Sequence, residues 1–435
     1  MKIAFFTLGC KVNQFETQAL RVLFSRRGHE CTEDARSADA IIINTCTVTA
    51  VSDKKSRQLI RRVNRENPDA TVAVCGCLSQ VSPGQVLSIP GVDIIAGTGE
   101  REKLVDALEK AYSGEKTDAM LDNPFNRREY EILPAGGESD HTRAFLKICD
   151  GCENFCAYCI IPYARGPVRS LPPDAAVSQA KELESQGFRE IVITGIEISS
   201  YGVDLSPPLT LTDMVEAVCA AVPGVRVRLG SLEPRMITKD FTERLSKLNN
   251  LCPHFHVSLQ SGCDETLKRM RRKYDTRLYF DAVSLLRESF LNCAITTDLI
   301  AGFPGETEAE FNKTLEFIEK CGFVDMHIFP YSRRANTPAY NMENQITRAV
   351  KAARAKAASD VARKSRESFL NSQIGLILNV LWEEFDSPDW AGHSENYIKV
   401  YANAGGDMRN KISGVLITGV FKDGLRGEIT RVSVS

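Results

Sequence analysis

Long apolar runs are missing from this chain of 435 residues. No stretch approaches the roughly 20 consecutive apolar residues that a membrane-spanning helix needs. The first ten residues, MKIAFFTLGC, have the pattern of a strand rather than of a cleavable signal. We therefore expect a protein without a membrane segment that works in the cytoplasm. The length allows two to four domains with a substantial core.

Net charge is also nearly absent, because 54 basic residues stand against 56 acidic ones. The basic side chains nevertheless cluster. Residues 53–65 and 268–277 each hold six basic side chains against one acidic, and residues 348–366 hold seven against one. A single run of this kind is typical of a solvated helix face. Three of them in a nearly neutral chain favour a polyanionic partner.

Cysteine, by contrast, is plentiful. Fourteen cysteines in a reducing compartment indicate metal or redox chemistry rather than disulfides. Cys152, Cys156 and Cys159 follow the spacing C-x-x-x-C-x-x-C. Fully ligated clusters and structural zinc sites usually take four protein ligands, so a four-iron cluster held here keeps one iron open to a substrate or cofactor. The alternative is a zinc knuckle or three buried thiols. Cys149 falls within the preceding predicted strand, and we expect it to pack in the core.

Residues 1–115 alternate short apolar runs, such as IAFFTL and AIIINT, with polar stretches of helical period. This pattern predicts a small parallel-sheet α/β domain. Residues 116–143 lose the period and are rich in proline, glycine and charge. We expect them to form a linker.

Three cysteines end successive strands of this predicted domain: Cys10, Cys46 and Cys77. In open parallel sheets ligands bind beyond the carboxyl ends of the strands, so these thiols can converge although they are distant in sequence. Three thiolates again suit a cluster with one open iron. Cys75 competes with Cys77 for the third position, and free cysteine is also a common core residue. Both interpretations stay open on spacing alone.

Strand–helix alternation resumes over residues 144–345, where six β/α units predict an open partial (β/α)6 barrel, because eight are needed for closure. Its catalytic groups should lie at the carboxyl ends of its strands. Residues 346–370 predict an alanine-rich basic helix. Residues 371–435 contain closely spaced strand signals with glycine turns, which predict a small closed, OB-like β-barrel.

A cofactor site should use the other strand ends of the predicted partial barrel. Polar side chains and glycines stand there, and glycine lets a backbone approach a ligand closely. Tyr158 precedes the last cysteine of its motif. The further predicted cofactor-binding residues are Thr194, Gly195, Ser231, Glu233, Ser258, Gln260 and Gly302.

With these residues in place, the chain resembles the radical S-adenosylmethionine (SAM) methylthiotransferases over essentially its whole length. Three separate domains carry the resemblance, which makes it specific. The C-terminal barrel is similar to the TRAM domain, an RNA-binding module of the same family. The matching segments are LGCKVNQFE (8–16), NTCTV (44–48), GCLSQ (76–80), CENFCAYCIIPYARG (152–166), ITGIEISSYG (193–202), RLGSLEP (228–234), HFHVSLQSGCDETLKRM (254–270), DLIAGFPGETEAEF (298–311) and HIFPYSRRANTPA (327–339).

The resemblance implies two [4Fe–4S] clusters. Cys152, Cys156 and Cys159 would hold the one that cleaves SAM, and Cys10, Cys46 and Cys77 an auxiliary one. The family pattern G-C-x-x-Q selects Cys77 over Cys75. Two SAM molecules would be used per turnover, one cleaved to a radical and one methylating sulfur on the auxiliary cluster.

Family branches differ in their acceptor. IIPYARG and SRRANTPA look most like the branch that modifies carbon 2 of N6-threonylcarbamoyladenosine in the anticodon loop of tRNA (position 37). Asn336 departs from that branch, where glycine is usual. The implied partners are tRNA and an external one-electron reductant such as flavodoxin or ferredoxin, with the enzyme acting as a monomer.

The C-terminal barrel carries six basic against eight acidic residues, so the three basic runs are the better predicted phosphate contacts. Two other acceptors compete within the family: isopentenyladenosine in tRNA and a ribosomal-protein aspartate. Outside it, the alternatives are a two-cluster electron carrier and an RNA-binding zinc protein.

Overall fold

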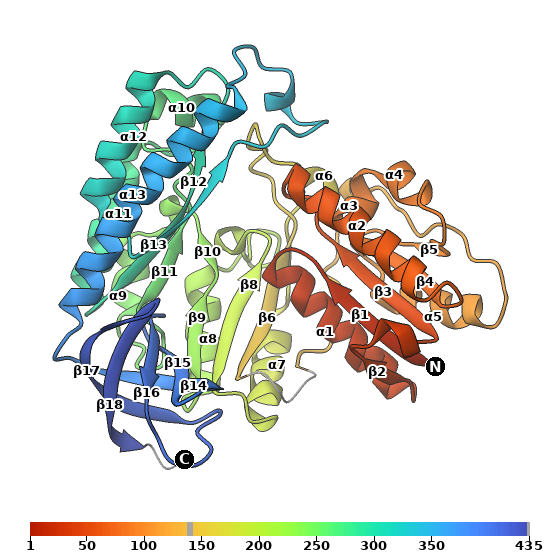
Figure 1. The fold of residues 1–435 in the computed structure, drawn as a ribbon, viewed down its shortest axis with the longest axis horizontal. Helices are drawn as coiled ribbons and strands as arrows, with labels where there is room; N and C mark the ends of the chain where they lie inside the picture. Colours follow the sequence, from red (N-terminus) through yellow and green to blue (C-terminus); the bar gives the residue numbers. More distant parts are fainter. Residues whose placement is uncertain (137–141, 433–435) are drawn as a thin grey trace.

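The computed structural model describes residues 1–136 and 142–432. Figure 1 shows an N-terminal α/β part, a central part built around curved sheets, and a small C-terminal barrel at the base of the central part. No helix in the described ranges is long and apolar enough to cross a membrane. The predicted fold class is confirmed in all three parts.

The N-terminal sheet has five parallel strands in the order β2-β1-β3-β4-β5. Its central strand, AIIINT, is wholly buried because helices cover both faces. The strands are β1 (Lys2–Thr7), β2 (Glu30–Thr32), β3 (Ala40–Thr45), β4 (Thr71–Gly76) and β5 (Ile94–Ile95). The helices are α1 (Lys11–Arg26), α2 (Ala50–Glu66), α3 (Cys77–Val81), α4 (Pro83–Leu87) and α5 (Arg101–Tyr112).

Over its described residues 116–136, the predicted linker is irregular chain apart from one short 3-10 helix, η2 (Pro124–Asn126). It is not detached from the rest of the molecule. Leu133 and Ala135 are buried in the core of the central part, and the Tyr130 hydroxyl donates to the carbonyl of Lys147. The domain boundaries that the sequence suggests stay predictions.

The central part contains all six predicted strands. The third is interrupted at Gly230, so hydrogen bonding divides the partial barrel into two sheets, β7-β6-β8-β9 and β10-β11-β12-β13. The short β7 is antiparallel to β6, and the other neighbours are parallel. The strands are β6 (Arg143–Asp150), β7 (Arg169–Ser170), β8 (Glu190–Gly195), β9 (Arg226–Leu229), β10 (Ser231–Leu232), β11 (His254–Val257), β12 (Ala294–Ala301) and β13 (Asp325–Pro330).

Helices pack against the outer face of these sheets (Figure 1). Local sequence sets where they begin, since capping boxes at Thr210 and Thr307 satisfy the first backbone N–H groups of α8 and α12. The helices are α6 (Ile161–Arg165), α7 (Pro173–Ser185), α8 (Leu211–Ala221), α9 (Lys239–Leu245), α10 (Asp264–Arg269), α11 (Thr276–Ser289) and α12 (Glu308–Cys321).

Beyond the basic helix α13 (Arg348–Ser372), five strands close into a barrel in the order β14-β15-β16-β18-β17. The sequence predicted four of them. The missed strand contains aspartate, glycine and histidine and lacks a β-branched residue, so its propensity is low. The last three residues of the final predicted strand lie outside the described residues. The strands are β14 (Ile377–Asp386), β15 (Asp389–Ser394), β16 (Lys399–Ala402), β17 (Ile412–Phe421) and β18 (Gly424–Val432).

Specific polar contacts dock the outer parts onto the central one. The N-terminal part touches both sides of the partial barrel: Glu16 of α1 pairs with Lys147 of β6, and Arg334, which follows β13, donates to Thr47 and Asp53. At the base, the Arg228 guanidinium donates to backbone carbonyls of the loop that follows β15.

Candidate active site

The first cysteine trio occupies the loop between β6 and α6, at the carboxyl end of the partial barrel. Burial raises the pKa of Cys152, and the charges of Cys159 and Cys156 raise it further. Burial, followed by the charge of Cys156, also raises the pKa of Cys159 to about 12. The three thiols therefore lie close enough to repel one another as thiolates. A bound metal cation favours the thiolate form instead, because cysteine ligands lose their protons when they bind a metal.

Arg272 stands beside this trio, although the sequence placed it in a basic run assigned to phosphate contacts. Its Nη1 lies 3.1 Å from the sulfur of Cys156 and 3.4 Å from the Tyr158 hydroxyl, and its Nη2 donates to Glu233. The side chain is almost fully buried. A guanidinium here offsets negative charge on the sulfurs. The spacing of basic residues in 268–277 does not distinguish this arginine from its neighbours.

A second carboxylate, Glu197, completes the polar surroundings of this loop. It accepts hydrogen bonds of 2.9 Å from the Asn154 side chain and from the backbone N–H of Ser199. Burial, followed by the charge of Glu233, raises its pKa. The sequence offered no role for Glu197. The structure gives it one in positioning the cysteine loop through Asn154.

The second trio gathers at the carboxyl edge of the N-terminal sheet. Cys10 caps α1, Cys46 follows β3, and Cys77 opens α3. Burial is the largest cause that raises the pKa of Cys46, and the charge of Cys10 adds to it. Burial also raises the pKa of Cys77 to about 12, with contributions from both other thiols. A Cβ atom at position 9 would lie 2.8 Å from the Cys46 sulfur, so only glycine fits there.

Two rival cysteines are packed elsewhere. Cys75 belongs to the apolar core beneath the N-terminal sheet, and burial raises its pKa to about 11 with no contribution from the second trio. Cys149 lies in the central core and donates to the carbonyl of Glu197. Both positions agree with a packing role.

The two trios face each other across the junction of the N-terminal and central parts. The charge of Cys77 is among the causes that raise the pKa of Cys159, and α3 packs against α6. Arg165, on α6, lies between them: after burial, its charge is the largest influence on the pKa of Cys77, and it lowers that pKa. The fold thus brings six cysteines from four separate segments of the chain to one place.

A buried ionic network fixes this junction. Glu16 is 1% exposed and accepts from Arg101 Nη2 at 2.9 Å, from Lys147 Nζ at 3.0 Å and from both terminal nitrogens of Arg165. Asp150 shares two of these cations. Although burial alone would raise the pKa of Glu16, the charges of its cationic partners lower it well below 4.5.

The network continues to the second trio, because Arg165 also donates to Asn13, whose amide oxygen lies 3.8 Å from the sulfur of Cys10. Both Arg165 and Arg169 are buried, so neither lies at the surface. The sequence around Asn13 and Glu16 of α1 does not indicate that their partner, Arg165, lies more than a hundred residues away.

The predicted cofactor-binding residues have mixed surroundings. Tyr158 and Glu233 meet at Arg272, beside the first trio. The open sides of Gly195 and Gly302 are filled by protein, namely by the Cys149 sulfur and the Lys351 side chain. The roles of all eight stay predictions. Of the others, Thr194 and Gln260 are buried, Ser258 is half-buried and Ser231 is exposed.

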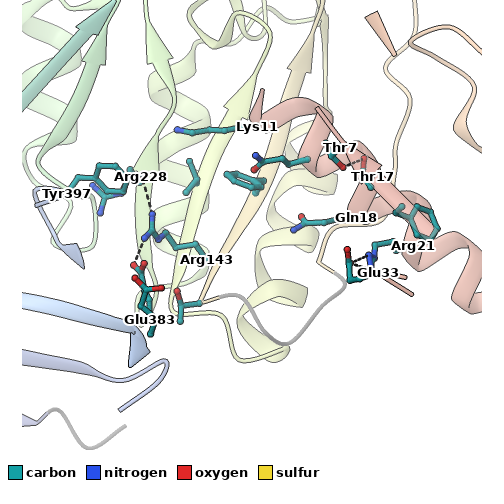
Figure 2. Close-up of a pocket in the computed structure, with 16 residues that line it drawn as sticks. Thr7, Lys11, Thr17, Gln18, Arg21, Glu33, Arg143, Arg228, Glu383 and Tyr397 are labelled. Carbon is teal, nitrogen blue, oxygen red and sulfur yellow. Dashed lines mark hydrogen bonds and ion pairs between the residues drawn. The ribbon is translucent and has the colours of Figure 1, made fainter. Parts of the chain in front are cut away.

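A large polar cavity of about 630 Å³ lies between α1, the inner face of β6, β8 and β9, and the C-terminal barrel. Figure 2 shows Lys11 extending from the start of α1 toward Arg228. Positions 11, 14, 18 and 21 of α1 all line it, as the helical period requires. Burial, followed by the charges of Arg228 and Arg143, lowers the pKa of Lys11.

Two histidines of β11 form hydrogen bonds to a threonine of the neighbouring strand β12. His254 and His256 both meet the Thr296 hydroxyl. His256 and His327 also contact opposite oxygens of Asp298, at 3.3 and 3.2 Å. Although burial alone would raise the pKa of Asp298, these hydrogen bonds lower it.

Two family models match this chain. Residues 146–318 match the Radical SAM superfamily, and residues 2–97 match Uncharacterized protein family UPF0004. A protein of Bacillus subtilis (strain 168), "Threonylcarbamoyladenosine tRNA methylthiotransferase MtaB", is 41% identical over 95% of this chain and 93% of its own length. The chain belongs to the radical-SAM methylthiotransferases. A Chlamydia pneumoniae protein of the same name is 36% identical over 97% of the chain and 96% of its own length.

Other relatives of this methylthiotransferase carry a different name. A Clostridium tetani protein, "tRNA-2-methylthio-N(6)-dimethylallyladenosine synthase", is 34% identical over 97% of this chain and 95% of its own length. Among solved structures, the radical SAM methyltransferase TsrM from Kitasatospora setae superposes with a TM-score of 0.59 at 13% identity, covering 78% of this chain and 73% of TsrM. That likeness concerns the fold alone.

Proposed function

We propose that this methylthiotransferase converts N6-threonylcarbamoyladenosine in the tRNA anticodon loop to its 2-methylthio derivative. Relatives named for that reaction, at 35 to 41% identity, cover most of the chain. The observation that carries the proposal is the meeting of two cysteine trios, since methylthio transfer needs a radical source and a sulfur source at one base.

The donor sets suit iron–sulfur clusters. Each offers three thiols within electrostatic reach of one another, and the remaining cysteines near them are packed in cores. Cys152, Cys156 and Cys159 would hold the cluster that cleaves SAM, and Cys10, Cys46 and Cys77 the auxiliary one. When bound, these groups supply the radical and the methylthio sulfur that an unactivated C–H demands.

The protein's own residues hold the geometry. Glu16 and Arg165 lock the trio-bearing segments together, and their burial keeps water from the junction. Arg272 places positive charge beside the sulfur of Cys156. Tyr158 and Glu233 are the predicted SAM contacts best placed beside the first trio, because both bind Arg272.

The RNA would reach this site through the basic runs rather than through the C-terminal barrel alone. The basic side chains of α2 between residues 54 and 65 are mostly exposed. In contrast, Arg354 of α13 is committed to Glu306, which removes it from the predicted phosphate contacts. Because the acceptor is tRNA, we place the enzyme in the cytoplasm, as a monomer supplied with electrons by a flavodoxin or ferredoxin. The C-terminal barrel would serve as a TRAM module.

Mass spectrometry of tRNA nucleosides tests the proposal. A strain lacking this gene should lose 2-methylthio-N6-threonylcarbamoyladenosine and keep the unmodified precursor. A plasmid copy should restore the product, whereas a copy with Cys156→Ala should not. Persistence of the product in the deletion strain would refute the proposal, and loss of the methylthio-isopentenyl nucleoside instead would assign the other tRNA acceptor.

The isopentenyladenosine acceptor is the second candidate because relatives named for it are up to 34% identical over nearly the whole chain. The same nucleoside profile separates the two, since each predicts the loss of a different product.

A further inference from the structure

The cavity between α1 and the central sheet holds charged side chains of both signs, and nearly all are paired. Arg228 pairs with Glu190, and Arg143 with Glu383. At the far end of α1, Arg21 pairs with Glu33. The last carboxylate lining the cavity, Glu384, meets Lys399 at 3.3 Å.

Lys11 is the exception. Its ammonium group forms no hydrogen bond or ion pair with any residue in the ranges 1–136 and 142–432, and it extends into the cavity toward Arg228 (Figure 2). The nearby guanidinium groups cannot neutralise it, and the surrounding carboxylates are already engaged. An unpaired cation in a partly desolvated cavity is costly unless an anion arrives.

Position along the chain links this cation to the reaction. Lys11 lines the cavity and directly follows Cys10 of the second trio, so the lining of the cavity starts one residue along the chain from that trio. In the proposed acceptor, carbon 2 and the N6 substituent flank the same ring nitrogen. A base presenting carbon 2 to the trio therefore carries its N6 substituent close to Lys11.

The two competing acceptors differ in the charge of that substituent. A threonylcarbamoyl group ends in a free carboxylate with a neighbouring hydroxyl, whereas an isopentenyl group is a hydrocarbon. The α1 face of the cavity offers Lys11, Gln14 and Gln18, which can bind a carboxylate and a hydroxyl and would be left unsatisfied by a hydrocarbon.

We propose that Lys11 binds the threonyl carboxylate of the acceptor nucleoside and thereby selects it over isopentenyladenosine. This inference rests on the proposed function and adds the residue that sets its specificity. Lys11 is a positioning residue with a recognition role, and the reacting carbon does not touch it.

Binding of anticodon stem-loop RNAs to the anaerobically reconstituted holoprotein tests this, with fluorescence anisotropy as the readout. The wild type should bind RNA carrying N6-threonylcarbamoyladenosine about tenfold tighter than the same RNA with adenosine. Lys11→Met should abolish that preference and leave the affinity for the adenosine RNA unchanged. Lys11→Arg should keep most of the preference. Lys110→Met, an exposed lysine of α5, is the matched control and should behave as the wild type.

A neutral substrate makes the test independent of any variant. An RNA whose threonyl carboxylate is a methyl ester should bind the wild type no better than the adenosine RNA. Equal preference in the wild type and Lys11→Met, or full affinity for the ester, would overturn the inference. Product analysis distinguishes a failure of the proposed function from a failure of this inference. Methylthiolation of isopentenyladenosine RNA would refute the proposed function. Methylthiolation of the threonylcarbamoyl RNA, with an unaltered binding preference in Lys11→Met, would refute this inference alone.

Discussion

Replacing Glu16 by glutamine should loosen the junction between the two trios. The change keeps the shape of the side chain and removes its charge. The Arg101 guanidinium then loses its ion pair with Glu16 and keeps the carbonyls of Gly97 and Gly99. Lys147 keeps a carboxylate, because Asp150 lies 2.6 Å from its Nζ.

The expected cost follows from this count. Breaking a buried ion pair by removing one partner costs about 3 to 5 kcal/mol. Since Asp150 still compensates part of the buried positive charge, we expect Glu16→Gln to lower the free energy of unfolding by about 3 kcal/mol, near the lower limit. The matched control is Glu216→Gln on α8, whose carboxylate pairs with the half-exposed Arg244 at the surface. A surface pair contributes about 0 to 1 kcal/mol.

Urea unfolding of the anaerobic holoproteins, followed by far-ultraviolet circular dichroism, measures both variants. The Glu16→Gln midpoint should fall well below that of Glu216→Gln. Limited proteolysis should also cut the segment between residues 116 and 136 faster in Glu16→Gln, because docking protects that chain. Equal midpoints for the two variants would mean that the network does not hold the junction, and the reasoning would be refuted.

Three further outcomes follow from the packing and the charges. Cys77→Ser should reduce bound iron to about half that of the wild type, since one of two clusters loses a ligand. Cys75→Ser should keep the full iron content. Colorimetric iron analysis of both variants tests this prediction. Stability should fall on acidification below about pH 4.5. Burial alone would raise the pKa of Glu190, but Arg228 lowers it to about 2, and a carboxyl with a lowered pKa stabilises the fold only while it is ionised. Tryptophan fluorescence during an acid titration measures the loss of stability, and a flat profile down to pH 2 would contradict the prediction. Trp382→Ala should cost about 3 to 5 kcal/mol by emptying the centre of the C-terminal barrel, which thermal unfolding measures.

Much of the fold was predictable because hydrophobic period and helix caps are local signals. The six strands of the partial barrel and the starts of α8 and α12 follow from residues adjacent in sequence. The strand Asp389–Ser394 was missed for the same reason. Its pairing with β14 and β16 comes from its neighbours rather than from its own composition.

The cysteines were accessible to sequence reasoning because metal-binding spacing and strand ends both constrain them. The residues that connect the trios were not. Glu16, Arg165 and Arg272 have ordinary neighbours in sequence. Glu16 pairs with Arg165 across two parts of the molecule, and Arg272 pairs with a residue of its own part that is distant in sequence, Glu233. Charge runs also misled, since one arginine of a basic run can turn inward while its neighbours face solvent.

Asn336 shows the reverse case. The sequence flagged it because glycine is usual there, and the structure gives it a φ of +65°. Asparagine tolerates this left-handed conformation better than most residues, so the local backbone survives the departure.

The C-terminal barrel is clamped to the base of the central sheets by arginine-to-carbonyl bonds rather than tethered by a slack linker. If RNA binds both to the barrel and at the edge that carries the cysteine trios, the distance between these two binding sites is constant. Such an enzyme would select its nucleotide by its distance along the folded RNA from the position that the barrel binds. A substrate with one base pair added to its stem would then present the wrong base.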